Sequence, residues 1–166
     1  MIKYIDGDAT QPIGEGKKVI CHVANDLGGW GLGFVIAISK RWDSPESYYK
    51  ALIKSLPPEN RLGIVQYCTV EKDIVVANMV AQHDIRRSAD GTPPIRYDEL
   101  RKCLRDVNTY CIVHNATVHA PRFGAGLSGG SWAIIEQIIK EEITVPVTIY
   151  DYDLVRQPLN LKSYEW

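Results

Sequence analysis

The sequence predicts an α/β fold: a three-layer α/β/α sandwich with a mixed central sheet. Short segments rich in Val and Ile alternate with segments whose apolar residues recur at helical spacing. Such alternation is typical of a sheet that is covered by helices. Two of the strand-like segments, residues 62–70 and 74–80, are separated only by Glu71, Lys72 and Asp73. That short link predicts an antiparallel hairpin, and hence a mixed sheet.

The expected strands are short and apolar, and they are bounded by polar or glycine-containing segments. In chain order they are residues 2–6, 18–24, 62–70, 74–80, 116–120 and 145–150.

The first expected helix covers residues 31–42, where Phe34, Val35, Ile38 and Trp42 recur at helical spacing. A second helix is expected to start at Ser44-Pro45-Glu46, with Ser44 as its N-cap and Pro45 at its first helical position. It should end before Pro57-Pro58.

Two further helices are expected in the second half of the chain. The first of them has apolar residues at i, i+3, i+4, i+7, i+10 and i+11, which predicts a strongly amphipathic helix. These positions are Leu100, Cys103, Leu104, Val107, Tyr110 and Cys111. The other helix covers residues 132–142. Residues 82–94 are polar and contain one glycine and two prolines, so we expect an exposed loop there.

The composition indicates one domain, which we place at residues 1–155, followed by a polar C-terminal tail at residues 156–166. A chain of 166 residues with 45% hydrophobic residues can bury a full core. The net charge of −1 provides no basic field, so we expect no general nucleic-acid binding. No apolar run approaches the ~20 residues needed to span a bilayer, and the N-terminus has no signal-peptide pattern. We therefore expect a cytoplasmic monomer that does not bind membranes.

The four cysteines form no Cys-x-x-Cys pair, and we expect them to be buried and reduced. The four histidines, His22, His83, His114 and His119, show no ligand spacing with these cysteines, so no metal site and no cofactor is expected. We interpret His22 and His119 as structural.

Two glycine-rich loops, each between a strand and a helix, are the main functional signal. The first contains Gly28, Gly29, Trp30, Gly31, Leu32, Gly33 and Phe34, and the second contains Arg122, Phe123, Gly124, Ala125, Gly126, Leu127 and Ser128. Backbone N–H groups at such positions bind anions, above all phosphates. Two loops of this kind suggest two sides of a site for one diphosphate.

Three motifs in order resemble the macro domain family. They are Gly7-Asp8-Ala9-Thr10 after the first strand, Val23-Ala24-Asn25 with its glycine loop, and the Pro121–Gly126 loop. The resemblance covers about residues 2 to 153. It is strongest to the branch that contains the terminal ADP-ribose protein glycohydrolase, whose second loop also carries Pro-Arg-x-Gly-x-Gly-Leu.

The resemblance implies an α/β/α fold that binds ADP-ribose or an ADP-ribosylated substrate in a cleft. Asp8, with Ala9 beside it, matches the aspartate that accepts a hydrogen bond from the adenine amino group. Asn25 matches the asparagine that contacts the distal ribose, and the two glycine loops match the diphosphate loops. Tyr152 is the candidate for the aromatic residue that covers adenine, with Tyr150 as an alternative.

The chain departs from that branch at two catalytic positions. The branch uses a lysine just after the second strand of the hairpin, where this chain has Ala81, Gln82 and His83, and an aspartate where it has Ser128. A covalent lysine mechanism is therefore not expected. Asn25, Asp26 and His83 are the candidate catalytic residues for attack by water. For Asp26 and His83, exposed loop residues are the alternative interpretation.

Two of the loop residues have open roles. Arg122 can pair with a phosphate or hold its loop through a carboxylate. Trp30 can lie in the core or contact the ligand. We expect an enzyme that hydrolyses ADP-ribosyl derivatives at the distal ribose, either carboxylate-linked ADP-ribose or O-acetyl-ADP-ribose, without a metal. The alternatives are an ADP-ribose reader without activity and a phosphatase acting on ADP-ribose 1″-phosphate.

Overall fold

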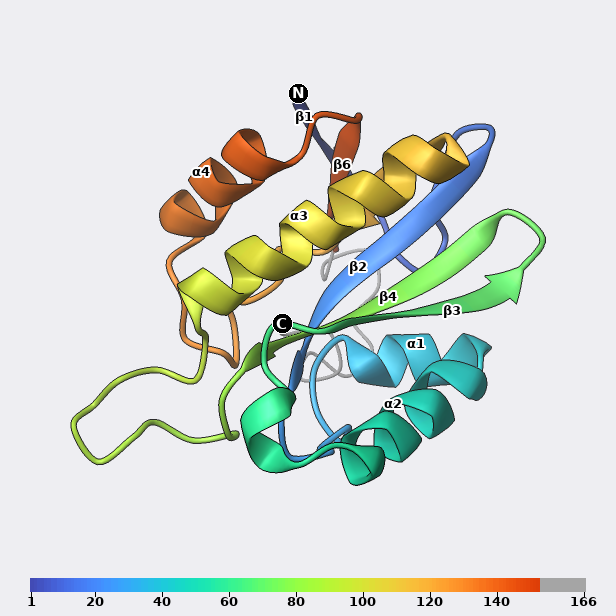
Figure 1. Ribbon diagram of the computed structural model, residues 1–166. Helices are drawn as coiled ribbons and strands as arrows, with labels where there is room; N and C mark the ends of the chain where they lie inside the picture. Colours follow the sequence, from blue (N-terminus) through green and yellow to red (C-terminus); the bar gives the residue numbers. More distant parts are fainter. Residues whose placement is uncertain (153–166) are drawn as a thin grey trace.

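The computed structural model describes residues 1–152 of the chain (Figure 1). Its strands form one six-stranded sheet in the order β1-β6-β5-β2-β4-β3. All neighbouring strands are parallel except β3 and β4, which form the expected antiparallel hairpin. The predicted C-terminal tail, residues 156–166, lies outside the described residues. The strands are β1 (Ile2–Asp6), β2 (Lys17–Asn25), β3 (Val65–Glu71), β4 (Ile74–Gln82), β5 (Ala116–Ala120) and β6 (Val147–Asp151).

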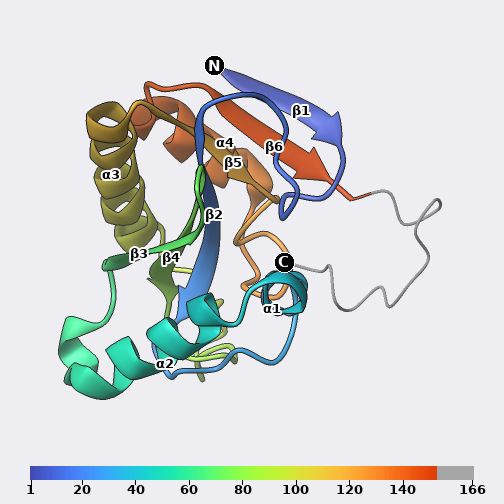
Figure 2. The ribbon, with the colours of Figure 1, turned by 90° about the vertical axis from the view of Figure 1, so that its right-hand side faces the viewer.

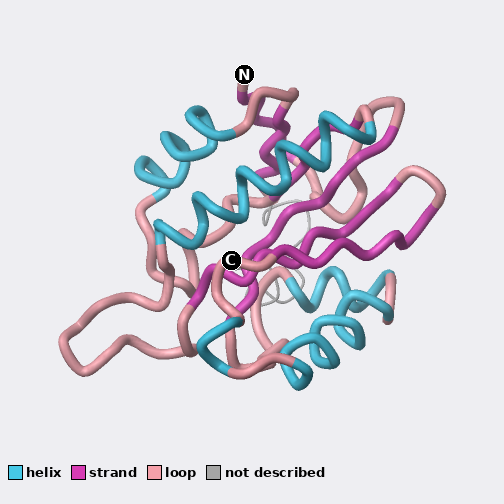
Figure 3. Tube along the Cα trace, in the orientation of Figure 1, coloured by secondary structure: helices cyan, strands magenta, loops and turns pink. Residues whose placement is uncertain are grey.

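Two pairs of helices cover the two faces of the sheet, which confirms the predicted three-layer α/β/α fold (Figures 1 and 2). Helices α1 (Val35–Arg41) and α2 (Ser44–Ser55) lie on one face, and a short 3₁₀ helix (Pro58–Asn60) follows them. Helices α3 (Tyr97–His114) and α4 (Trp132–Glu142) lie on the other face. Figure 3 shows how strands and helices alternate along most of the chain.

Strand β2 lies inside the sheet and is buried on both faces, which explains its nearly continuous apolar sequence. Val19 and Cys21 contribute to the core under α3 and α4, whereas Ile20 contributes to the core under α1 and α2. The predicted apolar stripe of α3 is confirmed, since its buried residues include Leu100 and Leu104. All four cysteines are free and buried, as expected.

Two details of the helix prediction are wrong. The first helix begins at Val35 rather than at residue 31, because the preceding glycines form an irregular loop in which Gly33 has φ +83°. A left-handed φ ends regular α-helical geometry and favours glycine. The second helix begins at Ser44, so Asp43 is the N-cap residue, and no side chain caps this helix end.

The loops that matter for function gather at one edge of the sheet. β2, β4 and β5 run parallel, so their carboxyl ends meet at that edge, where ligands of open α/β sheets bind. Residues 26–34, 83–96 and 121–131 follow these three strands. The segment 83–96 extends well away from the body of the molecule, at the lower left of Figure 1. Within residues 1–152, no helix combines the length and apolar character needed to cross a membrane.

Candidate functional site

A cavity of about 310 Å³ lies between the two glycine-rich loops, at the carboxyl end of β2. Gln82 and Ile85, from the end of β4 and the loop after it, complete its wall. The structure therefore brings the two predicted phosphate loops together at one site. The predicted ligand-binding residues that line the cavity are Asn25, Gly29, Trp30, Gly31, Leu32, Gly33, Phe34, Phe123, Gly124, Leu127 and Ser128.

The side chain of Asn25 holds the start of the first loop. Its Oδ1 accepts hydrogen bonds from the N–H groups of Leu27 and Gly29, at 2.9 and 3.0 Å, and its Nδ2 donates to the Gly29 carbonyl at 2.9 Å. The Tyr49 hydroxyl donates to the main-chain oxygen of Asn25 and accepts from the N–H of Gly28. The structure thus gives Asn25 a role in shaping the loop, which is the turn function common for asparagine.

The first loop offers its N–H groups at the middle rather than at the start. The sequence pattern assigned the N–H groups of Gly28 and Gly29 to phosphate, but that of Gly28 donates to the Tyr49 hydroxyl of α2 and that of Gly29 to Oδ1 of Asn25. No described residue accepts a hydrogen bond from the N–H groups of Gly31, Leu32 or Gly33. These three groups belong to residues that line the cavity.

The second loop is closed by two hydrogen bonds of its own backbone. The N–H of Gly129 donates to Gly126 at 3.0 Å, and the N–H of Gly130 donates to Gly124 at 2.8 Å. Within residues 1–152, the N–H groups of residues 124–128 donate to no acceptor. Gly124 has φ +77°, and a side chain there would also press on Ile95 and on Ile135. The glycine at this position is required by the backbone itself.

The two sets of unengaged N–H groups define what the site can bind. They belong to loops on either side of one cavity, and consecutive backbone N–H groups bind anionic oxygens well. A diphosphate between the loops would receive hydrogen bonds from both. Within residues 1–152 no group of three or more His, Cys, Asp or Glu side chains is arranged to hold a metal ion.

Ser128 and Gln82 connect the second loop to the sheet. The Ser128 hydroxyl donates to Oε1 of Gln82 at 2.5 Å, and Nε2 of Gln82 donates to the carbonyl of Asp84 at 2.9 Å. The carbonyl of Ser128 also accepts from the N–H of Ile95. Sequence reasoning missed Gln82 and Tyr49 as site residues, because Gln82 was assigned to an exposed loop and Tyr49 to a helix. The structure places Gln82 at the end of β4 and Tyr49 in α2.

Aromatic residues form the apolar wall of the cavity. Trp30 is only 6% exposed, and its indole N–H donates to the Ser39 hydroxyl at 2.7 Å. Its ring lies 5.4 Å from the ring of His22 and 5.3 Å from that of Tyr49, between centroids. Trp30 is therefore a core residue that also lines the cavity, and its contact with a ligand stays a prediction. Phe34 is buried beside it.

His22 and His119 are both buried, in agreement with their interpretation as structural residues. Burial lowers the pKa of each imidazole to about 4, so both rings are neutral at physiological pH. Nε2 of His22 lies 2.5 Å from Oδ1 of Asn78, whereas its Nδ1 has no hydrogen-bond partner. His119 contacts the hydroxyl of Tyr150 at 2.7 Å. Unlike His119, His22 also lines the cavity.

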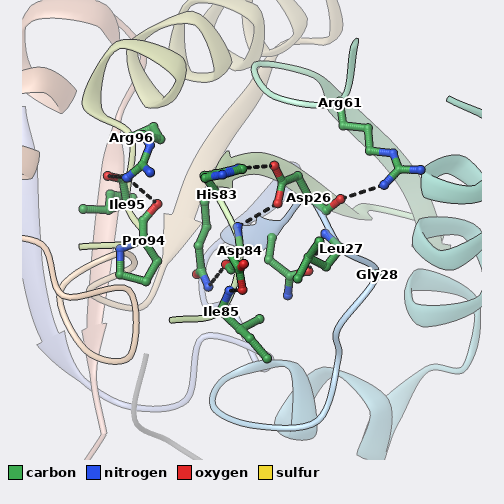
Figure 4. Close-up of polar contacts among 12 residues, drawn as sticks. Asp26, Leu27, Gly28, Arg61, His83, Asp84, Ile85, Pro94, Ile95 and Arg96 are labelled. Atoms are coloured by element: carbon green, nitrogen blue, oxygen red, sulfur yellow. Dashed lines mark hydrogen bonds and ion pairs between the residues drawn. The ribbon is translucent and has the colours of Figure 1, made fainter. Parts of the chain in front are cut away.

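The side chains of Asp26 and His83 contact one another beside the cavity (Figure 4). Oδ2 of Asp26 lies 2.7 Å from Nδ1 of His83, and its Oδ1 accepts from the N–H of Asp84 at 2.7 Å. Arg61 donates to the main-chain oxygen of Asp26 from the other side. Asp26 is 6% exposed, whereas the His83 side chain is 52% exposed. Neither side chain lines the cavity, although their neighbours Asn25 and Gln82 do.

Several predicted binding residues lie outside the cavity wall. Oδ1 of Asp8 accepts hydrogen bonds from the N–H and the hydroxyl of Thr10, at 2.8 and 2.7 Å. Arg122 pairs through two contacts with the Asp151 carboxylate, at 2.6 and 3.0 Å. For Arg122, the structure thus shows the second of the two alternatives, in which a carboxylate holds the loop. The other predicted residues outside the wall are Ala9, Gly28, Ala125, Gly126 and Tyr152.

Tyr150, the alternative to Tyr152, is unsuited to covering a ligand. It is 1% exposed, and its hydroxyl accepts from the N–H of Ile13 as well as contacting His119. Its ring also lies close to Gly7. Tyr150 therefore supports the segment around Asp8 from within the core. Tyr152 is partly exposed and remains the candidate.

No family model matches the chain. A solved structure of a protein of unknown function from Bacteroides thetaiotaomicron is 52% identical, with a TM-score of 0.87, over 91% of this chain and 98% of that one. A macrodomain protein from Streptomyces coelicolor is 41% identical, with a TM-score of 0.80, over 92% of this chain and 100% of that one. An uncharacterized 17.5 kDa protein of Enterobacteria phage T4 is 28% identical over 141 residues, 84% of this chain and 88% of that protein.

The likeness to the Streptomyces protein over its full length shows that this chain belongs to the macrodomain family. A more distant solved structure is DarTG of Thermosipho africanus in complex with ADP-ribose. It is 15% identical, with a TM-score of 0.62, over 82% of this chain and 38% of that one, and at this identity it shows the fold alone.

Proposed function

We propose that this protein binds ADP-ribose in the cavity between its two glycine-rich loops. The observation that carries the proposal is that two loops on either side of one cavity, residues 31–33 and 124–128, have N–H groups with no acceptor among residues 1–152. They would hold the diphosphate. The ADP-ribose in the Thermosipho DarTG complex supports the choice of this ligand.

On either side of the diphosphate, the adenine and the distal ribose of the ligand would occupy separate subsites. In our proposal the adenine amino group donates to Asp8, and Tyr152 covers the adenine ring. The distal ribose lies at the carboxyl end of β2, near Asn25 and Gln82. The order of these subsites follows the family resemblance, as does assignment to the terminal ADP-ribose protein glycohydrolase branch.

We propose further that the protein hydrolyses carboxylate-linked ADP-ribose or O-acetyl-ADP-ribose. One water is consumed, the ester bond at the distal ribose is broken, and ADP-ribose and a carboxylic acid are released. Asp26 would orient His83 through its Nδ1 contact, and a histidine held in this way can take the proton of an attacking water at Nε2. This route needs no metal and no covalent intermediate.

One observation favours the second candidate, a reader that binds ADP-ribose without hydrolysing it. The side chains of Asp26 and His83 do not line the cavity, so neither is placed to touch a ligand that fills it. A reader needs only the two loops and the adenine subsite.

A panel of substrates distinguishes the two candidates. Carboxylate-linked ADP-ribose on a protein, O-acetyl-ADP-ribose and ADP-ribose 1″-phosphate are each incubated with the protein, and the products are identified by mass spectrometry. Release of ADP-ribose from either ester, unchanged by EDTA, is the result expected of the hydrolase. Binding of ADP-ribose with no release from any substrate leaves the reader function. Release from the 1″-phosphate alone would instead identify a phosphatase.

A further inference from the structure

The carboxylate of Asp8 is held through one of its two oxygens. Oδ1 accepts hydrogen bonds from the N–H and from the hydroxyl of Thr10, at 2.8 and 2.7 Å. Thr10 is 2% exposed, whereas Asp8 is partly exposed. Among residues 1–152, no donor reaches Oδ2 of Asp8. One oxygen of this carboxylate is therefore fixed by the protein, and the other is left for a ligand.

Arg41, the last residue of α1, determines where the Thr10 hydroxyl points. Its Nε donates to Oγ1 of Thr10 at 2.9 Å. A guanidinium can only donate, so the Thr10 oxygen accepts in this contact, and its single hydroxyl proton is directed to Asp8. The positive charge of Arg41 polarises that hydroxyl and strengthens the hydrogen bond that it donates. The three side chains thus form a chain of hydrogen bonds that runs from Arg41 through Thr10 to Asp8.

The backbone around Asp8 is held by other contacts. The N–H of Gly7 donates to the carbonyl of Asp151 at 2.8 Å, and the N–H of Gln11 donates to the carbonyl of Asp8 at 2.9 Å. These two hydrogen bonds fix the end of β1 and the turn that follows it. The Thr10 hydroxyl takes part in neither of them, so its effect falls on the carboxylate of Asp8.

We propose that Thr10 and Arg41 are positioning residues through which Asp8 selects adenine. This inference rests on the proposed binding of ADP-ribose with its adenine at Asp8. A carboxylate oxygen only accepts, so it suits the amino group of adenine and is repelled by the carbonyl oxygen that hypoxanthine carries at the same place. A carboxylate that is held in position enforces this difference, whereas one that can rotate away tolerates either base.

The test compares ADP-ribose with inosine diphosphate ribose by calorimetry, and the quantity measured is the ratio of the two affinities. Thr10→Val keeps the shape of the side chain but removes the hydroxyl, so the preference for the adenine ligand should fall about fivefold. Thr10→Ser keeps the hydroxyl and should stay within about twofold of wild type. Arg41→Ala frees the hydroxyl to rotate and should lower the preference about threefold. Lys54→Ala, which removes an exposed charge from α2, is the matched control and should leave the ratio unchanged.

A double-mutant cycle shows whether Thr10 acts through Asp8. In the Asp8→Asn background the carboxylate is already lost, so adding Thr10→Val should lower the preference for adenine no further. A second fall of the same size in that background would mean that Thr10 acts independently of Asp8, and it would overturn the inference.

The outcomes separate this inference from the function on which it rests. If wild type prefers the adenine ligand, but Thr10→Val and Arg41→Ala keep that preference or weaken both ligands alike, the inference is wrong and ADP-ribose binding stands. Because Arg41 is exposed, Arg41→Ala provides this result even if Thr10→Val fails to fold. Equal binding of both ligands by wild type would refute the Asp8 contact and this inference with it. Binding of neither ligand would refute the proposed function itself.

Discussion

Oδ2 of Asp26 lies 2.7 Å from Nδ1 of His83, although 57 residues separate them in the chain. The pair forms where β2 and β4 end side by side, one residue beyond Asn25 and Gln82. Asp26 is buried and receives the N–H of Asp84, so its position is well determined. The exposed His83 is the partner that can be changed without disturbing the core.

His83→Ala is the substitution that separates hydrolase from reader. If His83 activates the attacking water, the single-turnover rate on carboxylate-linked ADP-ribose should fall about 100-fold, which is typical for the loss of a general base. Affinity for ADP-ribose should stay within about twofold. His114→Ala, on the exposed end of α3, is the matched control and should change neither quantity. A wild-type rate in His83→Ala would remove this residue from the mechanism.

Gly31 offers a direct test of the first loop. A side chain there meets nothing within 4 Å, so Gly31→Glu should fold normally and place a carboxylate at the cavity. Because the new carboxylate repels the diphosphate, the affinity for ADP-ribose should fall by at least about 30-fold, or roughly 2 kcal/mol. Calorimetry measures the affinity, and thermal unfolding checks the fold. Gly31→Lys has similar bulk and the opposite charge. If both variants bind like wild type, the phosphates lie elsewhere.

Asp8 should set the preference for adenine. Asp8→Ala should cost about 1.5–3 kcal/mol in ADP-ribose affinity, the scale of a hydrogen bond to a charged group. The substitution also removes the acceptor for Thr10, so Asp8→Asn is the better-controlled change, since an amide oxygen can still serve Thr10. Affinities for ADP-ribose and inosine diphosphate ribose are compared. A folded variant that still prefers the adenine ligand as strongly as wild type would disprove the assignment.

Stability should fall as the pH drops from about 6.5 to 4. The folded pKa values of His22 and His119 are lowered to about 4 by burial, below the unfolded value of 6.5. In this window the unfolded chain binds more protons than the folded one, so the free energy of unfolding decreases with pH. Each histidine accounts for about 3 kcal/mol by pH 4. Urea unfolding of wild type and His22→Gln measures this, and the variant should show the smaller decrease. Equal pH profiles would contradict the buried neutral state of His22.

The fold could be predicted because each element carries its own local signal. The strands and the stripe of α3 follow from apolar periodicity, and the hairpin follows from the three-residue link between its strands. The start of α1 could not be predicted as well, since the helical spacing of Phe34, Val35 and Ile38 does not show where the glycine loop ends and the helix begins.

The site was predictable at its loops and not in its supporting contacts. Both glycine segments lie where the pattern placed them, and Asp26 and His83 were candidates that the structure then joined. By contrast, the hydrogen bond of Tyr49 to Asn25 and that of His22 to Asn78 join residues 24 and 56 positions apart. Such contacts depend on strand register and helix packing, which single-sequence patterns do not encode.

Calorimetry with ADP-ribose, ADP and AMP tests the central claim most directly. We predict micromolar binding of ADP-ribose, on the order of −7 to −8 kcal/mol, with weaker binding of ADP and weaker still of AMP. The loops would account for the gain in affinity from AMP to ADP. Contacts with the distal ribose would account for the gain in affinity from ADP to ADP-ribose. Equal affinity for ADP and ADP-ribose would contradict recognition of the distal ribose, and no binding of ADP-ribose would contradict the account as a whole.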